Sequence, residues 1–395
     1  METSKERSLE EINEILNLAK LNESDVKCTS QVIYFTDKKL HENNYRLLQL
    51  DSHLLNEVCE GNTLYIKGND DDEVVICSDN RTFHVTDAET SNSLLLVNNV
   101  IFGNNIKDNV DEGKKISKIE VCGIFYEYLE AVVGKPHLKR LIQLLQDCVY
   151  KGPELEFEVD KQKLITIEEL NDIIQASSKE IEVALNSMNV VIIDEKVRLL
   201  DFEYHFRVLS YMLKLIDENS WQLDEIDYEE TIDALGDLVP REVICCLFDK
   251  YADNSKIIDG LQLYRYKENE VCKFFAQVLL HGAGKFNLKD FLQAWKESVP
   301  EGMAPDEEML YGIAIIDRKT NPNVVWAFDE SSLPDNITER FKTLFETKEK
   351  WRVPEISPYI KCFATEKVDV NALLAKHARS SKVDGVKYYS AKHGK

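Results

Sequence analysis

The segment SSKEIEVALNSMNVVIIDEKVRLL, residues 177–200, predicts a helix followed at once by a β-hairpin. Ile181, Leu185 and Met188 recur at helical spacing, so the first half has one apolar face. In the second half two apolar runs flank the polar residues 194–196, which predicts two strands and a tight turn. A helix followed by such a hairpin is typical of the winged helix, a helix-turn-helix variant with a strand ribbon beside it.

Two more helices are predicted upstream of this segment. Residues 137–149, HLKRLIQLLQDCV, place leucine and isoleucine at helical spacing. Residues 166–176, TIEELNDIIQA, open with a capping box formed by Thr166 and Glu169. Together with the helix and hairpin they predict a first winged helix over residues 121–221.

The same order of helices and strands recurs twice downstream. Residues 222–284 contain two helical patterns, a strand segment LQLYRYKEN and a further helix. Residues 285–395 contain a helix, the strand pair GIAIIDRKTNPNVVWAF, more helices and the strand GVKYYSA. The spacing of these segments predicts two further winged helices, residues 222–284 and 285–395.

The N-terminal residues 1–102 read as a strand-rich region. Short apolar and aromatic runs alternate with turn signals in QVIYF, YRLLQLD, TLYIKG, EVVICS, RTFHVTD and SLLLV. The acidic run at residues 70–73 lacks the spacing of a calcium loop and is interpreted as a hairpin tip. We predict no helix to cover this region, so its strand edges need a partner. A β-barrel-like domain completed by partner chains, then a linker at residues 103–120, makes the chain an α+β multidomain protein.

Composition limits the classes of protein to which the chain can belong. It has 395 residues, 44% of them hydrophobic, which is enough for real cores. No run of 18 apolar residues occurs and the N-terminus has no signal region, so we expect a soluble, non-secreted protein with no membrane contact. Nine cysteines without a C-x-x-C pair indicate buried thiols in a reducing compartment.

Sequence signals for catalysis are weak. The segment HGAGKF contains Gly284 and Lys285 but lacks the earlier glycine and the Ser or Thr of a phosphate loop. The histidines do not form a metal motif, and Cys245, Cys246 and Cys272 lie in apolar helical runs. We therefore expect no catalytic residue, no cofactor and no metal. A nucleotide-dependent enzyme built around HGAGKF stays as the minor alternative.

The C-terminal segment KHARSSKVDGVKYYSAKHGK, residues 376–395, is basic in a chain of formal net charge -23. Such a segregated patch suggests a surface for a polyanion. We predict a helix over residues 369–381 that buries Leu373 and Leu374 and turns Lys376 and Arg379 outward. The candidate DNA contacts are Lys376, Arg379, Ser380, Lys382, Lys387, Tyr389 and Lys392. A disordered tail is the alternative, and it is retained for residues 391–395.

Three C-terminal segments carry a family resemblance. KFNLKDFLQAWKESVPEGM (285–303), LPDNITERFKTLFETKEKWRVPEISPYI (333–360) and LLAKHARSSKVDGVKYY (373–389) resemble the DCC-type sister chromatid cohesion proteins. Weaker similarity extends upstream through TLYIKG, VVICS and IIQASSKEI. The resemblance implies a nuclear, noncatalytic subunit of the alternative replication factor C clamp loader.

The resemblance also implies partners. In that family the N-terminal strands form a shared barrel with a small subunit and the large ATPase subunit. The first winged helix helps to dock on DNA polymerase epsilon, the later ones bind DNA, and the sliding clamp is engaged indirectly. No Asn or Gln flanks the arginine, so binding without sequence preference is expected. A winged-helix scaffold that binds only proteins remains the alternative, because residues 217–237 are acidic.

Overall fold

The computed structural model describes residues 8–22, 29–35, 45–70, 72–102, 115–364, 368–383 and 385–392. In these residues the chain is a mixed α+β protein with several separate sheets, which confirms the predicted class. It divides into two compact units. Unit 1 contains residues 1–144 and 167–188, and unit 2 contains residues 145–166 and 189–395. The domain boundaries proposed from the sequence stay predictions.

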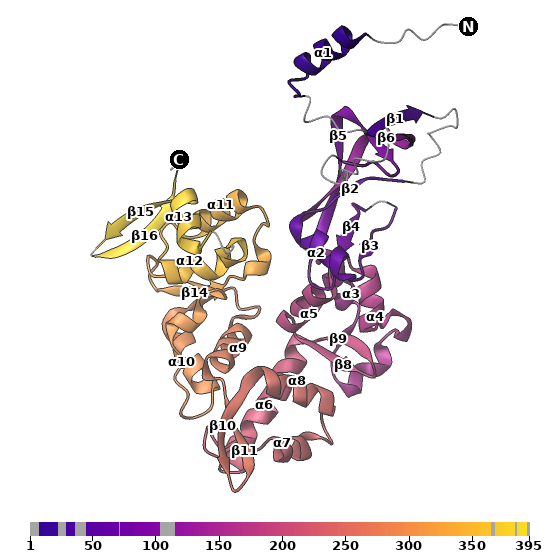
Figure 1. Ribbon diagram of the computed structural model, residues 1–395. Helices are drawn as coiled ribbons and strands as arrows, with labels where there is room; N and C mark the ends of the chain where they lie inside the picture. Colours follow the sequence, from indigo (N-terminus) through magenta and orange to yellow (C-terminus); the bar gives the residue numbers. More distant parts are fainter. Residues whose placement is uncertain are drawn as a thin grey trace. The chain divides into compact units, whose positions relative to one another are not determined.

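Unit 1 is built on one sheet with the strand order β1-β6-β5-β4-β3, and β2 also pairs with β6. Within the described residues this sheet is open and does not close into a barrel (Figure 1). β3 and β4 form the predicted hairpin around the acidic run. Residues 115–120, predicted as linker, are the first residues of β6. The strands are β1 Thr29–Phe35, β2 Leu48–Gln49, β3 Tyr65–Lys67, β4 Val75–Cys77, β5 Thr82–Val97 and β6 Lys115–Val133.

Unit 1 also contains a helix that the sequence analysis missed. α2 (Ser52–Glu60) places Leu54 in a small core with Ile76, Phe83 and Ala131, so the prediction of a strand region without a helix was wrong. Asp51 caps this helix at one end and Gly61, at φ 79°, ends it. Both are ordinary helix boundary signals. The other helices with residues in unit 1 are α1 Leu9–Leu18, α3 Lys139–Gln146, which continues into unit 2, α4 Ile167–Ile173 and α5 Ser178–Ser187.

Polar contacts join the sheet of unit 1 to its helices. The Lys67 ammonium donates to the backbone carbonyls of Asn171, Ile174 and Ala176, which lie at the end of α4. Thr82 donates to the carboxylate of Glu180, 2.6 Å away, at the start of α5. The three bonds from Lys67 supply a donor to carbonyls at a helix end, where intrahelical partners are lacking.

Unit 2 begins with a three-stranded sheet in which β9 (Lys196–Leu200) lies between β7 (Val149–Tyr150) and β8 (Val190–Ile193). The hairpin predicted from residues 190–200 is confirmed, and its turn residues Asp194 and Glu195 both have positive φ. Two short 3-10 helices, Pro153–Glu158 and Lys161–Lys163, precede it. The long helix α6 (Phe202–Glu218) that follows was missed by the sequence analysis.

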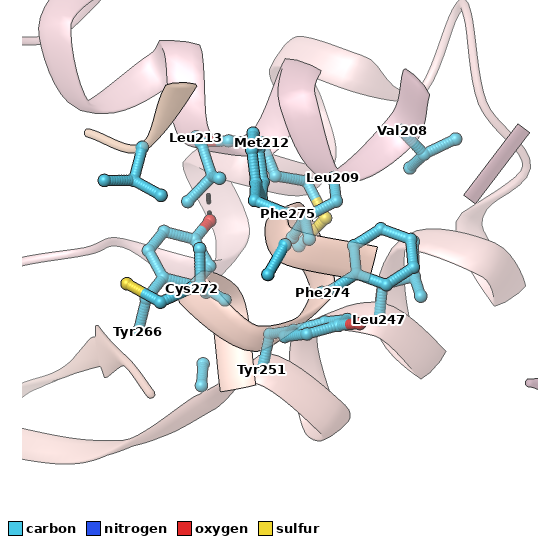
Figure 2. Packing of buried hydrophobic residues seen from close by; sticks show 14 of the residues in the cluster. Val208, Leu209, Met212, Leu213, Leu247, Tyr251, Tyr266, Cys272, Phe274 and Phe275 are labelled. Carbon is cyan, nitrogen blue, oxygen red and sulfur yellow. Dashed lines mark hydrogen bonds between the residues drawn. The ribbon is translucent and has the colours of Figure 1, made fainter. Parts of the chain in front are cut away.

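The main core of unit 2 is formed by α6 and the elements of residues 226–299. Figure 2 shows Phe274 and Phe275 beside residues of α6 and α8, with the Tyr266 hydroxyl donating to the Met212 carbonyl, 3.4 Å away. Trp295 is fully buried there and donates from Nε1 to the Cys272 carbonyl over 2.7 Å. The elements are α7 Tyr228–Leu235, α8 Arg241–Tyr251, β10 Ala252–Ile258, β11 Leu261–Tyr266, α9 Glu268–Leu280 and α10 Leu288–Ser298.

The C-terminal part of unit 2 has a second sheet and a second core. The sheet order is β12-β14-β13, so β13 is an edge strand. Gly282 and Gly284 follow the end of α9 with positive φ, and Lys285 begins β12, which confirms HGAGKF as a helix end. The elements are β12 Lys285–Asn287, the 3-10 helix Glu307–Leu310, β13 Ala314–Asp317, β14 Val324–Ala327, the 3-10 helix Glu330–Ser332, α11 Ile337–Thr347, α12 Val353–Ile360 and the 3-10 helix Lys361–Phe363.

Candidate nucleic-acid interface

The basic C-terminal segment forms a short helix and a hairpin (Figure 1). α13 (Val370–His377) begins at Asp369, whose side chain accepts from the Ala372 N–H, and it buries Leu373 and Leu374. Lys376 is exposed in the last turn, where the helix dipole favours a cation. These features of the helix agree with the prediction.

The predicted helix was too long at its C-terminal end. α13 ends at His377, and Ala378 already has extended dihedrals. Arg379 therefore lies on β15 (Ala378–Val383) and not on the helix face of Lys376. The reason is strand pairing, because six residues of β15 lie opposite six residues of β16 (Val386–Ala391). The Asp384-Gly385 dipeptide is a hairpin signal that the sequence analysis did not use.

The hairpin separates its candidate residues onto two faces. Lys382 lies directly opposite Lys387, and Ser380 lies opposite Tyr389. Because side chains alternate along a strand, these four residues share one face and Arg379 belongs to the other. Like charges directly opposite each other destabilise a hairpin. The pair Lys382 and Lys387 is thus not explained by folding alone.

Tyr389 has a structural position. Its side chain is 4% exposed in the second core, and its backbone exchanges two hydrogen bonds with Trp351. The Lys387 ammonium lies 5.0 Å from the Tyr389 ring centroid. The ring of Tyr389, a candidate DNA contact from the sequence, is therefore covered, and it anchors the hairpin to the core.

Two further lysines meet where the helix passes into the hairpin. The Lys392 ammonium donates to the Lys376 carbonyl over 3.0 Å. His377, next to Lys376 in the chain, stacks on Phe341, with ring centroids 5.1 Å apart. Burial, together with the charges of Lys376 and Lys392, lowers the pKa of His377. The histidine therefore adds little charge at neutral pH, and the positive field comes from the lysines.

The exposed cations of α13 and the β15–β16 hairpin have no acidic partner in the described part of the chain. Lys376, Arg379, Lys382, Lys387 and Lys392 are all exposed. None of them lies within ion-pair distance of a carboxylate in the described part of the chain. By contrast, Lys319 pairs with Glu349, and Lys348 pairs with Glu355. We call Lys376, Arg379, Lys382, Lys387 and Lys392 together the cationic surface. Such a surface can neutralise phosphates without reading bases.

The described residues offer little for other chemistry. They contain no group of three His, Cys, Asp or Glu side chains that could hold a metal ion. Burial raises the pKa of Cys272 to about 11 and also raises that of Cys246, which disfavours the reactive thiolates. In the same residues no helix is long and apolar enough to cross a membrane.

Comparison with known proteins gives the family. The profile described as sister chromatid cohesion protein Dcc1 matches residues 45–360. The chain belongs to the Dcc1 family of sister chromatid cohesion proteins. This confirms the resemblance noted in the sequence and supports a role in cohesion.

Members of the Dcc1 family from distant organisms align over most of this chain. The zebrafish protein is 33% identical over 387 residues, and the alignment covers 98% of each chain. The human protein is 32% identical over 393 residues, with 98% of each chain covered. The yeast protein is 24% identical and covers 87% of this chain. The profile match ends at residue 360, so the cationic surface lies outside it.

Proposed function

We propose that this chain is a noncatalytic scaffold subunit of an alternative replication factor C clamp loader. Such a loader places the sliding clamp at replication forks in the nucleus during cohesion establishment. The similarity to sister chromatid cohesion proteins over nearly the whole chain supports a cohesion role. The DNA part of the proposal rests on the cationic surface, whose five cations have no ion-pair partner among the described residues.

The sheet of unit 1 supports assembly with other subunits. Among the described residues its edge strand β1 pairs only with β6, and Ile33 and Phe35 on it are 49% and 58% exposed. An exposed, apolar edge strand is a liability that proteins usually cover. In our proposal a small subunit and the C-terminus of the large ATPase subunit cover it and complete a barrel.

The order of helices and hairpins along the chain supports the tandem winged helices that we propose. The hairpin β8–β9, the hairpin β10–β11 and the hairpin β15–β16 each follow helices in the chain. The first of these modules would contact DNA polymerase epsilon. The last would lay α13 and its hairpin along the phosphates.

The proposed DNA contact predicts a specific salt dependence. Each phosphate contact releases counterions, so the logarithm of affinity should fall by about 0.9 per contact for each logarithmic unit of salt. Contacts from Lys376, Arg379, Lys382 and Lys387 would give a slope of roughly 3 to 4 on duplex DNA. Fluorescence anisotropy of the full chain with two unrelated duplexes measures both the slope and the lack of sequence preference.

Charge reversal on the hairpin tests the assignment. Lys382→Glu with Lys387→Glu should lower the slope by about 2 and weaken both duplexes equally. The matched control is Lys342→Glu with Lys361→Glu, which changes the same charge elsewhere in unit 2. Unchanged DNA affinity in the hairpin variant, with the control also unchanged, would place the DNA surface elsewhere.

The second candidate function is a scaffold that binds only proteins. The acidic start of α7 favours it, because Asp227, Glu229 and Glu230 lie together on the second predicted module. Under this function the full chain shows no salt-dependent DNA binding, yet it still purifies with the barrel subunits. The anisotropy experiment separates the two candidates.

A further inference from the structure

A groove lies in the C-terminal part of unit 2, beside the edge strand β13. Its cavity volume is about 720 Å³. Six consecutive residues, 314–319, line one wall, which means that the groove follows the strand edge and not only one face. The opposite wall comes from residues 347–352 and from the hairpin residues Val383, Val386 and Tyr388.

The edge of β13 presents unused backbone groups to this groove. The Phe328 N–H donates to the Ile313 carbonyl over 2.8 Å. Antiparallel bonds alternate along a strand, so Ile315 also bonds toward β14 while Ala314 and Ile316 point their backbone groups away from it. Among the described residues, no other element pairs with this edge of β13.

The strand itself is fixed and mostly buried. Ala314 is 7% exposed and belongs to the main core of unit 2, while Ile315 is 3% exposed and belongs to the second core. Buried backbone groups are almost always paired in native proteins. A rigid strand with one free edge in a groove is therefore suited to pair with an extended main chain.

The hairpin part of the wall opposite β13 is apolar. Val383 lies opposite Val386 in the hairpin, and Tyr388 shares their face by alternation. Val383 and Val386 are 40% and 43% exposed. This face is the reverse of the one that carries Lys382 and Lys387. A ligand in the groove would thus not occupy the side of the hairpin that carries this lysine pair.

The charges around the groove favour an acidic ligand. Its lining contains five cations, Arg318, Lys319, Lys348, Lys350 and Arg352, against four carboxylates, Glu307, Asp317, Glu349 and Glu355. Arg318 pairs with Glu307, and Glu355 is shared by Lys348 and Arg352. Lys350 forms no ion pair with a described carboxylate. Lys319 also pairs with Glu349, so the lining has one cation more than it has carboxylates, whereas the whole chain has a net charge of -23.

We propose that the groove binds an extended acidic peptide of a partner protein, which adds as a strand to the free edge of β13. Main-chain bonds to Ala314 and Ile316 give affinity, and alternate apolar side chains fill the space against Val383 and Val386. The four residues of β13 set the length of the ligand at about four to six residues. Acidic side chains of the peptide meet Lys350 at the rim.

The proposal is tested with a labelled peptide of about six residues that alternates Glu and Val, measured by fluorescence anisotropy on the full chain. The peptide should bind, and replacement of its Glu residues by Lys should weaken binding about tenfold. N-methylation of alternate peptide bonds should weaken binding about fivefold for each main-chain bond removed. Equal binding of the N-methylated and unmodified peptides would overturn strand addition.

Two variants locate the peptide in the groove. Val386→Asp, at an exposed position, should weaken the acidic peptide about tenfold, and Lys350→Glu should weaken it about threefold. Lys387→Glu is the matched control, because it makes the same charge change as Lys350→Glu and lies next to Val386 on the other face of the hairpin. Peptide affinity unchanged in both groove variants, or no binding by wild type at about 1 mM, would refute the proposal.

Discussion

Unit 1 and unit 2 bury their apolar side chains to different extents. In unit 2 one core connects α6 through α10 and contains large side chains such as Phe291 and Trp295, both with no exposed area. Unit 1 has a small core around Leu54 and Phe83 and further buried side chains on its helices, such as Leu170 and Ile181. Its sheet, in contrast, leaves apolar side chains such as Ile33, Phe35 and Ile116 exposed.

The long strand β6 shows this difference within one element. Ile119, Val121 and Phe125 are buried on one face, while Ile116 and Tyr126 are 65% and 64% exposed on the other. Val32 and Tyr34 of the neighbouring strand β1 lie opposite Lys118 and Glu120 on this same face and are 49% and 39% exposed. Single exposed apolar residues are normal, but several on one face of a sheet mark an interaction surface. Such an arrangement fits our proposal of a shared barrel.

The largest effect is expected in the core of unit 2. Trp295→Ala should lower the free energy of unfolding by about 3–5 kcal/mol, because it leaves a cavity and removes the donor to the Cys272 carbonyl. All four tryptophans lie in unit 2, so urea unfolding followed by tryptophan fluorescence reports on this unit. Leu238→Ala, at a 63% exposed position, is the control and should change little. If Trp295→Ala and Leu238→Ala unfold at similar urea concentrations, the buried core around Trp295 does not dominate the stability of unit 2.

In unit 1 a polar residue should also have a clear effect. Lys67→Met keeps the aliphatic stem but removes the donor to three backbone carbonyls, which should cost about 1.5–3 kcal/mol. Hydrogen exchange of residues 167–176 measures the local loss of protection. Lys179→Met, which removes an exposed ammonium nearby in sequence to the same helices, is the matched control. Protection equal to wild type would show that Lys67 does not hold the end of α4.

Unit 2 should also be the unit that weakens in mild acid. His205 is fully buried, stacks on Phe274, and neither ring nitrogen has a partner. Burial, and to a smaller extent the charge of Lys250, lowers the pKa of His205 to about 3. The unfolded chain takes up a proton near pH 6.5, but the folded chain does not.

Stability linked to His205 is therefore fully present above about pH 6.5 and falls as the pH is lowered toward 3. Between pH 7.5 and 5.5 the loss should be about 1.3 kcal/mol. His205→Phe, which keeps the stack on Phe274, should remove this part of the pH dependence in urea unfolding. If the variant and wild type show the same dependence between those two pH values, His205 is not the cause.

The smallest effect on stability is expected on the exposed face of β6. Ile116→Asp with Tyr126→Asp should change the free energy of unfolding of the isolated chain by about 0.5 kcal/mol or less, because both side chains are already in water. The same variant should fail to co-purify with the proposed small barrel subunit. Ile192→Asp, at a 49% exposed position of β8, is the control. Retained co-purification of the double variant would count against the shared barrel.

The sequence predicted elements whose signals are local. Ile181 and Leu185 are buried on α5, and the β8–β9 hairpin turns at residues 194–195 as expected. Gly282 ends a helix where a phosphate loop was the alternative. The missed elements had usable signals as well: Asp51 and Gly61 bracket α2, and the Asp384-Gly385 dipeptide joins β15 to β16. For the candidate interface the sequence identified the five cations but not the faces they share.

By itself, then, the sequence determined where amphipathic helices and hairpins form and that positive charge gathers at the C-terminus, because periodicity and turn chemistry act over a few residues. The tertiary structure decided which residues are covered. Tyr389 is buried because its backbone pairs with Trp351, and Arg379 leaves the helix because β16 offers β15 a partner. The free edge of β13 has the same origin, since pairing and burial depend on residues that are distant in the chain.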